Sequence, residues 1–252
     1  MIKFFRKIRQ TLLEKNRVSK YLIYAFGEII LVVIGILIAL QINDWNENRK
    51  NSIAEQKLLN ALLIEFESNL KILEDNIKLN DNNIKNSLLL GEYTNPNLSS
   101  FNEKEISLLL LGVFKDEPRF FPIQGTIEEI INSGKLSILS NSNLRKALSD
   151  WQSKVDNINR QEVYVVERRD IGHEFFIKEG NFRRHLNLIS VGKNNITPSK
   201  FADNDFSFLT KQEFESQLYL FVVASKNLKE NFYLPLREDI LQIIRFIESE
   251  IK

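Results

Sequence analysis

The 252-residue chain contains no cysteine, and its two histidines, five prolines and nine glycines are few for its length. Without cysteine the chain can form no disulfide, no thiolate metal site and no thiolate nucleophile, a composition that suits either side of a bacterial membrane. No sign of charge dominates either. The net charge is +1; residues 1–20 carry +6 and residues 21–42 carry −1, which leaves −4 for residues 43–252. This weakly acidic main part, without a clustered basic face, argues against nucleic acid as a partner.

Motifs that mark catalysis are missing as well. The sequence has no glycine-rich phosphate loop, no G-x-S-x-G elbow and no calcium-loop pattern. His173 and His185 are twelve residues apart, without other metal ligands nearby in the sequence, so we expect a packing or surface role for both. The acidic residues are scattered, and no catalytic pair of carboxylates stands out. The sequence therefore predicts a protein that is not an enzyme and uses no metal and no cofactor.

One stretch, residues 21–42, is long and apolar enough to cross a membrane. As a helix it would be about 33 Å long at roughly 1.5 Å per residue, against a hydrocarbon core of about 30 Å. Its one ionisable residue is Glu28. The uninterrupted apolar part, residues 29–40, is too short to span alone, so a spanning helix must hold Glu28 inside the membrane. We expect one transmembrane helix over residues 21–42.

The 20 residues before this stretch carry seven basic side chains, whereas only three follow it within 15 residues. Because excess basic charge stays cytoplasmic, the N-terminus is predicted inside and residues 43–252 outside. The lead is either an amphipathic helix on the inner leaflet or a disordered basic tail. In the first alternative the membrane surface is bound by Lys3, Arg6, Lys7 and Arg9. The end of the apolar run lacks the small residues of a cleavage site, which indicates an uncleaved signal anchor.

Three interpretations of Glu28 remain open. It lies in a helix–helix interface, it snorkels toward the inner surface beside Lys20 or Arg17, or it lines a proton or ion path. Gly35 and Ala39 form a small-xxx-small pair that lets a second helix approach closely. Glu28 lies seven residues before Gly35 and therefore on nearly the same face. The pattern favours a homo-oligomer whose transmembrane interface contains Glu28, Gly35 and Ala39.

Residues 1–48 resemble the N-terminal signature of a large family of single-pass membrane proteins from Gram-negative bacteria. The resemblance rests on MIKFFRKIRQ and SKYLIYAFGEIILVVIGILIALQINDWNE, including the Gly27-Glu28 pair and the exit around Trp45. Residues 131–148, INSGKLSILSNSNLRKAL, are similar more loosely. The family has no assigned activity. The resemblance implies a place in a bacterial inner membrane and implies no chemistry.

After the apolar stretch, residues 52–90 contain neither proline nor glycine. Their apolar residues follow alternating spacings of four and three, a heptad pattern typical of a long helix with a coiled-coil seam. The predicted seam consists of Leu59, Leu63, Phe66, Leu70, Leu73, Ile77, Asn80 and Ile84. Asn80 either fixes the register of this seam or is an ordinary hydrated position. The helix is expected to continue almost directly from the membrane span.

Shorter elements are predicted in the middle of the chain. A turn-rich break at residues 91–100 precedes a helix near residues 103–114. Pro118 and Pro122 predict an extended crossing, and a short helix over residues 127–133 stops at Gly134. Residues 140–143 supply cap residues for a second long helix. Charged clusters at residues 116–119 and 168–170 are expected on the solvated surface, and the pairs Phe120-Phe121 and Phe175-Phe176 in the core.

In the second long helix the four–three spacing runs from Leu144 to Ile158, and its continuation would reach Glu162 and Arg169. The seam either shifts phase toward residues 163 and 166 or buries a salt bridge. We expect the phase shift, because burying an ion pair costs desolvation.

Residues 181–205 are expected to hold a short hairpin. A third long helix begins near Thr210, with a seam that includes Phe232, and Pro235 ends or kinks it. The predicted fold is all-α, with one transmembrane helix followed by an elongated antiparallel bundle of long helices. The expected parts are a basic cytoplasmic lead (residues 1–20), a transmembrane helix (21–42) and an extracytoplasmic bundle (43–252).

Two classes of function follow from this organisation. The first is a membrane-anchored extracytoplasmic interaction module, a scaffold or sensor, that assembles through its transmembrane helix and binds a protein of the envelope. The alternative is a subunit of an ion channel or proton-coupled membrane complex in which Glu28 is the working group. The expected partners are the membrane and further copies of the chain.

Overall fold

The computed structural model describes residues 18–97, 100–189 and 196–251, and the chain divides into two compact units, residues 1–55 and 56–252. Every regular element among these residues is helical, and none is a strand. Helix α2 (Val18–Gly91) contains the apolar stretch and continues to the turn at residues 92–93. The predicted all-α class is confirmed, with one long apolar N-terminal helix followed by helices packed together.

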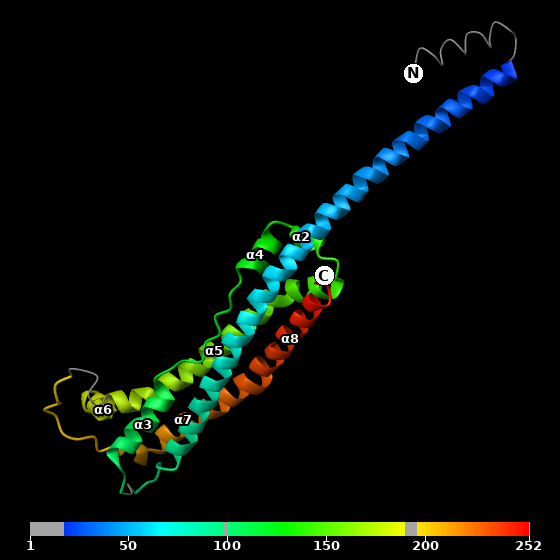
Figure 1. Ribbon diagram of the computed structural model, residues 1–252. Helices are drawn as coiled ribbons and strands as arrows, with labels where there is room; N and C mark the ends of the chain where they lie inside the picture. The colour runs from blue at the N-terminus through cyan, green and yellow to red at the C-terminus, as the bar shows by residue number, and fades with distance from the viewer. Residues whose placement is uncertain (1–17, 98–99, 190–195, 252) are drawn as a thin grey trace. The chain divides into compact units, whose positions relative to one another are not determined.

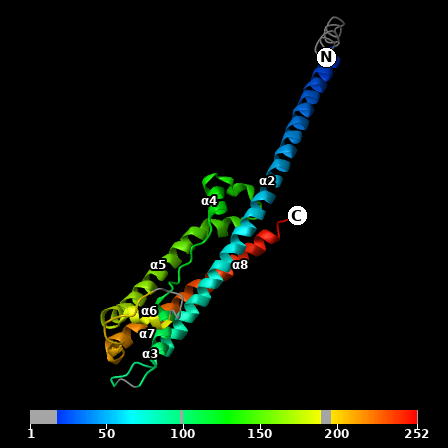
Figure 2. The same cartoon turned by 60° about the vertical axis from the view of Figure 1, so that its left-hand side comes forward.

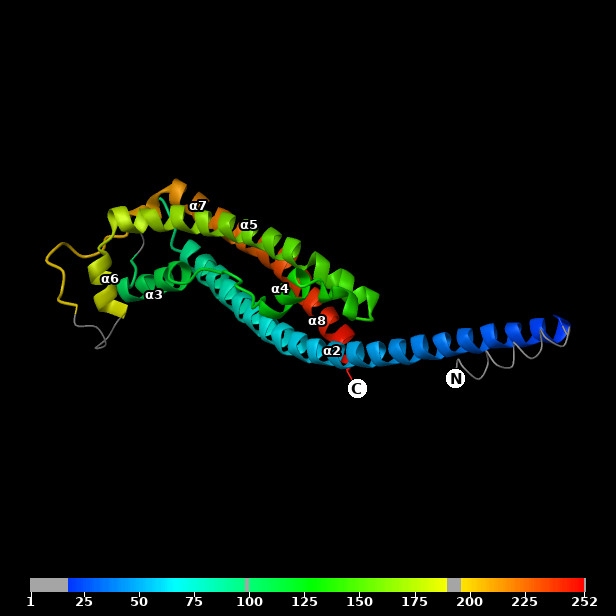
Figure 3. The same cartoon turned by 90° about the horizontal axis from the view of Figure 1, so that it is seen from above.

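Unit 56–252 is built from four limbs that alternate in direction (Figures 1, 2 and 3). The first is the part of α2 after residue 55. The second comprises α3 (Glu103–Phe114), the extended residues 115–124 and α4 (Gly125–Asn132). The third is α5 (Ser142–Glu179), which follows the 3₁₀ turn η1 (Lys135–Ile138). The fourth comprises α7 (Gln212–Leu228), the π-helical turn η3 (Lys229–Tyr233) and α8 (Leu234–Glu248).

Side-chain contacts establish the register of these limbs. Gln56 Nε2 donates to the carbonyl oxygen of Glu250 (2.8 Å), and Lys229 Nζ lies 2.7 Å from Oδ1 of Asp81. Residue numbers thus rise on α2 as they fall on the α7–α8 limb, so these two limbs are antiparallel. On α5, Glu162 contacts Tyr233 and Lys154 contacts Asp239 of α8, so α5 is antiparallel to the α7–α8 limb as well. Limbs one and three therefore run parallel to each other.

Local sequence signals place most helix ends. The side chain of Asn102 accepts hydrogen bonds from two backbone N–H groups at the start of α3, which has the predicted bounds. Asn141 caps α5 in the same way. Gly134 has φ 70°, a left-handed conformation that glycine adopts without steric cost, and it follows α4 as expected.

The buried face of α2 confirms part of the predicted seam. Leu59, Phe66, Leu73 and Asn80, spaced by seven, are fully buried. The intervening predicted positions are only half-buried against the core, namely Leu63, Leu70 and Ile77. Leu62 and Asn69, each one residue earlier, are fully buried instead. A helix that packs against several limbs buries a wider arc than a two-stranded seam does, which accounts for the difference.

The predicted phase shift in α5 is confirmed at Val166, which is buried, and wrong at Val163, which is 45% exposed. The four–three spacing itself continues through two charged residues, because Glu162 is 2% exposed and Arg169 is 6% exposed. These two residues do not pair with each other. Glu162 hydrogen-bonds to Tyr233 and to the backbone of Phe120, and Arg169 pairs with Glu117 and Asp170. These hydrogen bonds and ion pairs offset the cost of burying the two charged groups, and the spacing of apolar residues gives no information about them.

The predicted hairpin in residues 181–205 is also wrong. The described part of this segment begins with helix α6 (Phe182–Ile189) and contains no strand. A second 3₁₀ turn, η2 (Ser207–Thr210), then leads into α7. α3 and α6 lie at one end of unit 56–252, and α4 and the end of α8 lie at the other (Figures 1 and 3).

Pro235 does interrupt the third long helix, and the interruption takes the form of the π-helical turn η3 directly before α8. A π-turn inserts one extra residue into the helical repeat. Tyr233 is therefore fully buried, five residues after Leu228, while the predicted seam residue Phe232 is only half-buried.

The register of α2 can be tested with two adjacent leucines. Leu62→Ala should lower the free energy of unfolding by about 2–5 kcal/mol, because its side chain is fully buried. Leu63→Ala should cost less than about 2 kcal/mol, because a half-exposed side chain loses less buried area. Denaturant unfolding of the full chain in detergent measures both. Equal losses, or a larger loss at Leu63, would contradict this register.

Candidate functional site

The unusual feature of unit 56–252 is the extended segment of residues 115–124, here called the strap. It takes the place that a helix would occupy in a regular bundle. Pro118 and Pro122 prevent helix, since each lacks an N–H and drives the preceding residue to extended backbone. Between Glu65 and Asn83 α2 rises about 27 Å at 1.5 Å per residue. Residues 116–126 span at most about 36–40 Å when fully extended. The strap is therefore long enough to run alongside this part of α2, and its contacts with Asn69, Asn76 and Asn83 make it antiparallel to α2.

A ladder of amide side chains on α2 holds the strap backbone. Nδ2 of Asn69 donates to the carbonyl oxygen of Ile123 (2.8 Å), and the Ile123 N–H donates to Oδ1 of Asn69 (2.7 Å). The Arg119 N–H donates to Oδ1 of Asn76 (2.9 Å). Nδ2 of Asn83 donates to the carbonyl oxygen of residue 116 (3.1 Å). These bonds give the strap the partners that a helix would have found within itself.

Glu65, one turn before Asn69 on α2, likewise binds backbone groups of another segment, here the first residues of α4. Its carboxylate accepts hydrogen bonds from the N–H groups of Thr126 (2.6 Å) and Ile127 (3.2 Å). These are free donors at the N-terminus of α4, whose own cap residue makes no side-chain bond. A carboxylate at a helix N-terminus also interacts favourably with the helix dipole.

On the other side of the strap lies Glu162 of α5. Its Oε1 accepts a hydrogen bond from the Phe120 N–H (2.8 Å) and another from the Tyr233 hydroxyl (2.6 Å). Burial of the carboxyl, opposed by these two hydrogen bonds, raises the pKa of Glu162 to about 7. Burial and the nearby carboxylate raise the pKa of Tyr233, so it acts as a hydrogen-bond donor.

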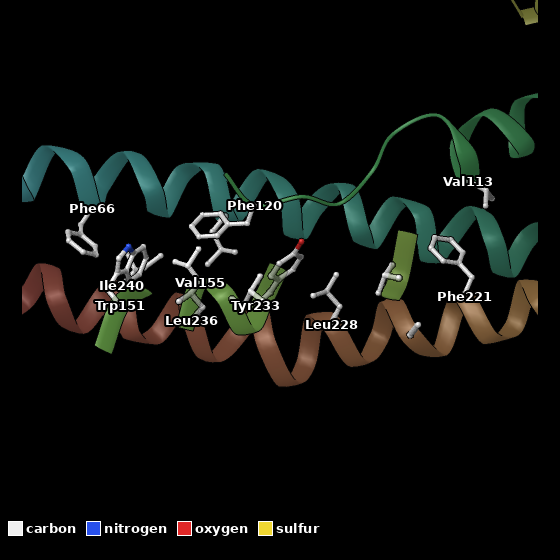
Figure 4. Packing of buried hydrophobic residues seen from close by; sticks show 14 of the residues in the cluster. Phe66, Val113, Phe120, Trp151, Val155, Phe221, Leu228, Tyr233, Leu236 and Ile240 are labelled. Carbon is white, nitrogen blue, oxygen red and sulfur yellow. The ribbon is translucent and has the colours of Figure 1, made fainter. Parts of the chain in front are cut away.

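Tyr233 reaches this acid because of the π-turn. Tyr233 is the last residue of η3, and the extra residue in the turn rotates its side chain into the core. In Figure 4 Phe120 and Tyr233 both point into the space between α2 and the α7–α8 limb. π-turns often occur at functional sites. This arrangement joins three limbs at one carboxyl group.

The two charged clusters expected on the surface in fact meet. Glu117 lies 2.8 Å from Nη2 of Arg169 and, through its other oxygen, 2.8 Å from Nε of Arg119. Arg169 also contacts Asp170 at 2.6 Å. The expectation of solvated surface is wrong for Arg169, which is buried. The pair Phe120-Phe121 was also expected in the core. Phe120 is buried but Phe121 is 71% exposed, because neighbouring residues of an extended segment face opposite sides.

The sequence carried a signal for the ladder that spacing of apolar residues alone did not detect. Asn69, Asn76 and Asn83 repeat every seven residues and so share one face of α2. Their side chains are those that bond to the strap backbone. Asn80, in contrast, lies on the seam toward α7 and donates to the carbonyl oxygen of Ser225 (2.9 Å).

Both histidines pack against aromatic rings, as expected. His173 stacks on Phe114 with ring centroids 4.9 Å apart, and His185 stacks on Phe182 at 5.5 Å. With Phe176 they line a largely apolar pocket of about 400 Å³ between α3, α5 and α6. Burial lowers the pKa of His185 to about 4 and also lowers the pKa of His173. No group of three or more metal-binding side chains occurs among the residues that the structure describes.

The residues predicted for the transmembrane interface lie on α2 within unit 1–55. Glu28 is partly exposed, Ala39 is exposed, and a Cβ added at Gly35 would meet no atom within 4 Å. An 18-residue window of this helix has a mean hydropathy of 2.5 and is not buried at all, so it is long and apolar enough to cross a membrane. The predicted surface-binding residues Lys3, Arg6, Lys7 and Arg9 lie outside the described residues.

A protein-family model matches residues 28–209 and describes a family of unknown function, DUF6090. Because the match covers more than half of the chain, the chain belongs to this family. The matched region begins at Glu28, inside the apolar part of α2, and ends in η2, so it includes the ladder, the strap and Glu162. No curated protein and no solved structure matches the chain.

The ladder can be tested at Asn69. Asn69→Ala leaves the N–H and the carbonyl oxygen of Ile123 without their partner and should lower the free energy of unfolding by about 2–4 kcal/mol. Asn82→Ala is the matched control, because this asparagine is exposed on the same helix; its effect should stay within about 0.5 kcal/mol. Denaturant midpoints of the full chain in detergent give both values. Indistinguishable midpoints for the two variants would remove the ladder as the anchor of the strap.

Proposed function

We propose that the protein is a membrane-anchored interaction module, a scaffold or sensor, whose helical unit binds a partner outside the cytoplasm. The observation that carries this proposal is the apolar part of α2, which has a mean hydropathy of 2.5 over 18 residues and no buried residue in that window. In water such a surface would be strongly unfavourable, whereas a bilayer or a partner helix covers it.

The proposed location is a bacterial inner membrane, with the N-terminus cytoplasmic and unit 56–252 periplasmic. Support for the orientation comes from the seven basic residues before the apolar stretch against three after it. The absence of cysteine is compatible with an oxidising compartment.

A binding role is proposed rather than catalysis because the most deeply buried acids of unit 56–252 accept hydrogen bonds from other parts of the fold. Glu65 caps α4, and Glu162 accepts from Phe120 and Tyr233. Both acids therefore support the bundle. The proposed partners are a protein of the envelope and further copies of this chain.

Self-association is proposed along the stripe of Glu28, Gly35 and Ala39. The space beside Gly35 admits a close second helix, and Ala39 lies one turn further on the same side. Within lipid the hydrophobic effect does not drive helices together, so close packing and polar contacts must do so. A stripe that combines small residues with one acid supplies both.

Orientation is tested with a reporter fused after Lys252. A reporter that is active only outside the cytoplasm should give signal, because basic residues hold the lead inside. The same fusion with a reporter that is active only in the cytoplasm is the control and should stay silent. The reverse pattern would refute the orientation, and recovery of the protein in the soluble fraction would refute the anchor.

Assembly is tested by crosslinking the full chain in native membranes. Glu28→Leu and Gly35→Leu should reduce the crosslinked dimer, since each removes a polar or a close contact, while Glu28→Gln should retain it. Gly27→Leu is the matched control, because residue 27 lies about 100° around the helix from Glu28.

The parent chain crosslinking to nothing, or Glu28→Leu assembling as well as the parent, would exclude this interface. Conductance or proton uptake that depends on Glu28 would favour the channel hypothesis instead.

A further inference from the structure

The strap differs from the rest of unit 56–252 in how its backbone is held. The N–H groups of Arg119, Phe120 and Ile123 donate to side chains of Asn76, Glu162 and Asn69. A helix can open only by breaking its own backbone ladder, but the strap can leave without disturbing any helix. Segments of this kind open at lower free energy than the global unfolding of the protein.

Glu162 is the anchor of the strap on the α5 side. It is 2% exposed and accepts a hydrogen bond from the N–H of Phe120 on the strap. The side chain of Phe120 is fully buried and points into the core (Figure 4). When this carboxyl ionises in place, a charge forms among apolar side chains with only two donors to solvate it. Withdrawal of Phe120 would let water reach the carboxylate.

The other groups near Glu162 do not cancel this effect. Tyr233 from η3 donates a hydrogen bond, and Arg119 from the strap exerts a favourable but weaker attraction. α2 contributes the neutral Asn76 to the neighbouring bond. On the strap itself, the hydrogen bonds from Arg119 and Arg169 lower the pKa of Glu117, which keeps that carboxyl ionised.

We propose that Glu162 is a proton-controlled latch that holds the strap closed when protonated and loosens it when ionised. The proton resides on Glu162 while Oε1 accepts from Phe120 and Tyr233. Loss of the proton to solvent leaves a buried carboxylate, and opening of the strap exchanges that burial for hydration.

The direction of the pH dependence follows from linkage. In the closed strap the pKa of Glu162 is about 7, and in the open strap, hydrated, it returns toward the ordinary 4.5. The closed state therefore binds this proton more tightly than the open state does. The resulting stabilisation of the closed state is fully present below pH 4.5 and is lost as the pH rises to 7. The equilibrium constant for opening should rise about tenfold per pH unit from pH 4.5 to pH 7 and stay level above it.

The test is hydrogen–deuterium exchange of the full chain in lipid nanodiscs, followed by mass spectrometry of the peptide that contains residues 116–124. Rates measured from pH 5 to 8 are divided by the intrinsic rate at each pH. The opening constant of the strap should rise about fortyfold between pH 5 and 7 and less than about twofold more by pH 8. A peptide from the first part of α5, residues 144–155, serves as the internal reference and should change little.

Two variants separate the latch from simple structural damage. Glu162→Gln keeps an acceptor but cannot ionise, so its strap exchange should lose the rise between pH 5 and 7. Tyr233→Phe removes a donor that favours the carboxylate, which raises the pKa further, so the levelling point should move above pH 7. A residue with only a packing role would change protection equally at every pH.

A strap exchange that is independent of pH in the parent chain would overturn the proposal. So would the same rise in Glu162→Gln, or an unmoved levelling point in Tyr233→Phe. The two histidines have lowered pKa values, so their protonation weakens the fold as pH falls, opposite in sign and common to all three proteins. The inference does not depend on the proposed function, since a chain that fails the reporter and crosslinking tests can still show the latch.

Discussion

An extended segment inside a helical bundle must find partners for its backbone N–H and carbonyl groups outside itself, and this requirement governs unit 56–252. A helix satisfies these groups internally; the strap, kept extended by Pro118 and Pro122, does not. The partners from α2 are asparagines at every seventh position and Glu65, which binds the start of α4; the partner from α5 is Glu162. The burial of Asn69, Asn83 and Glu162 is thus explained by one stretch of backbone.

The same requirement brings a titratable group into the core. An amide at position 162 would accept the Phe120 N–H as well as a carboxyl does, but it could not respond to pH. The carboxyl remains buried because Tyr233 supplies a second donor, and Tyr233 arrives only through the extra residue of η3. The π-turn, the strap and Glu162 therefore form one structural feature, and a change in any of them alters the other two.

The apolar part of α2 obeys a different constraint. An 18-residue window of this helix has a mean hydropathy of 2.5 and none of it is buried. Here the surroundings, lipid or a second helix, must cover the surface. The family match extends from Glu28 to Leu209, so membership in this family of unknown function involves both the apolar helix and most of the bundle.

The sequence by itself determined the helices, because heptad spacing, cap residues and prolines act within a few turns of chain. The bounds of α3, the cap at Asn141 and the left-handed Gly134 were all readable in this way. Only the tertiary structure decided the burial of Glu162 and Arg169, since their partners lie on limbs 42 to 71 residues away. It likewise replaced the expected hairpin by α6 and moved the seam from Phe232 to Tyr233. Local patterns fix backbone conformation, whereas the burial of a charge depends on a donor that only folding brings near.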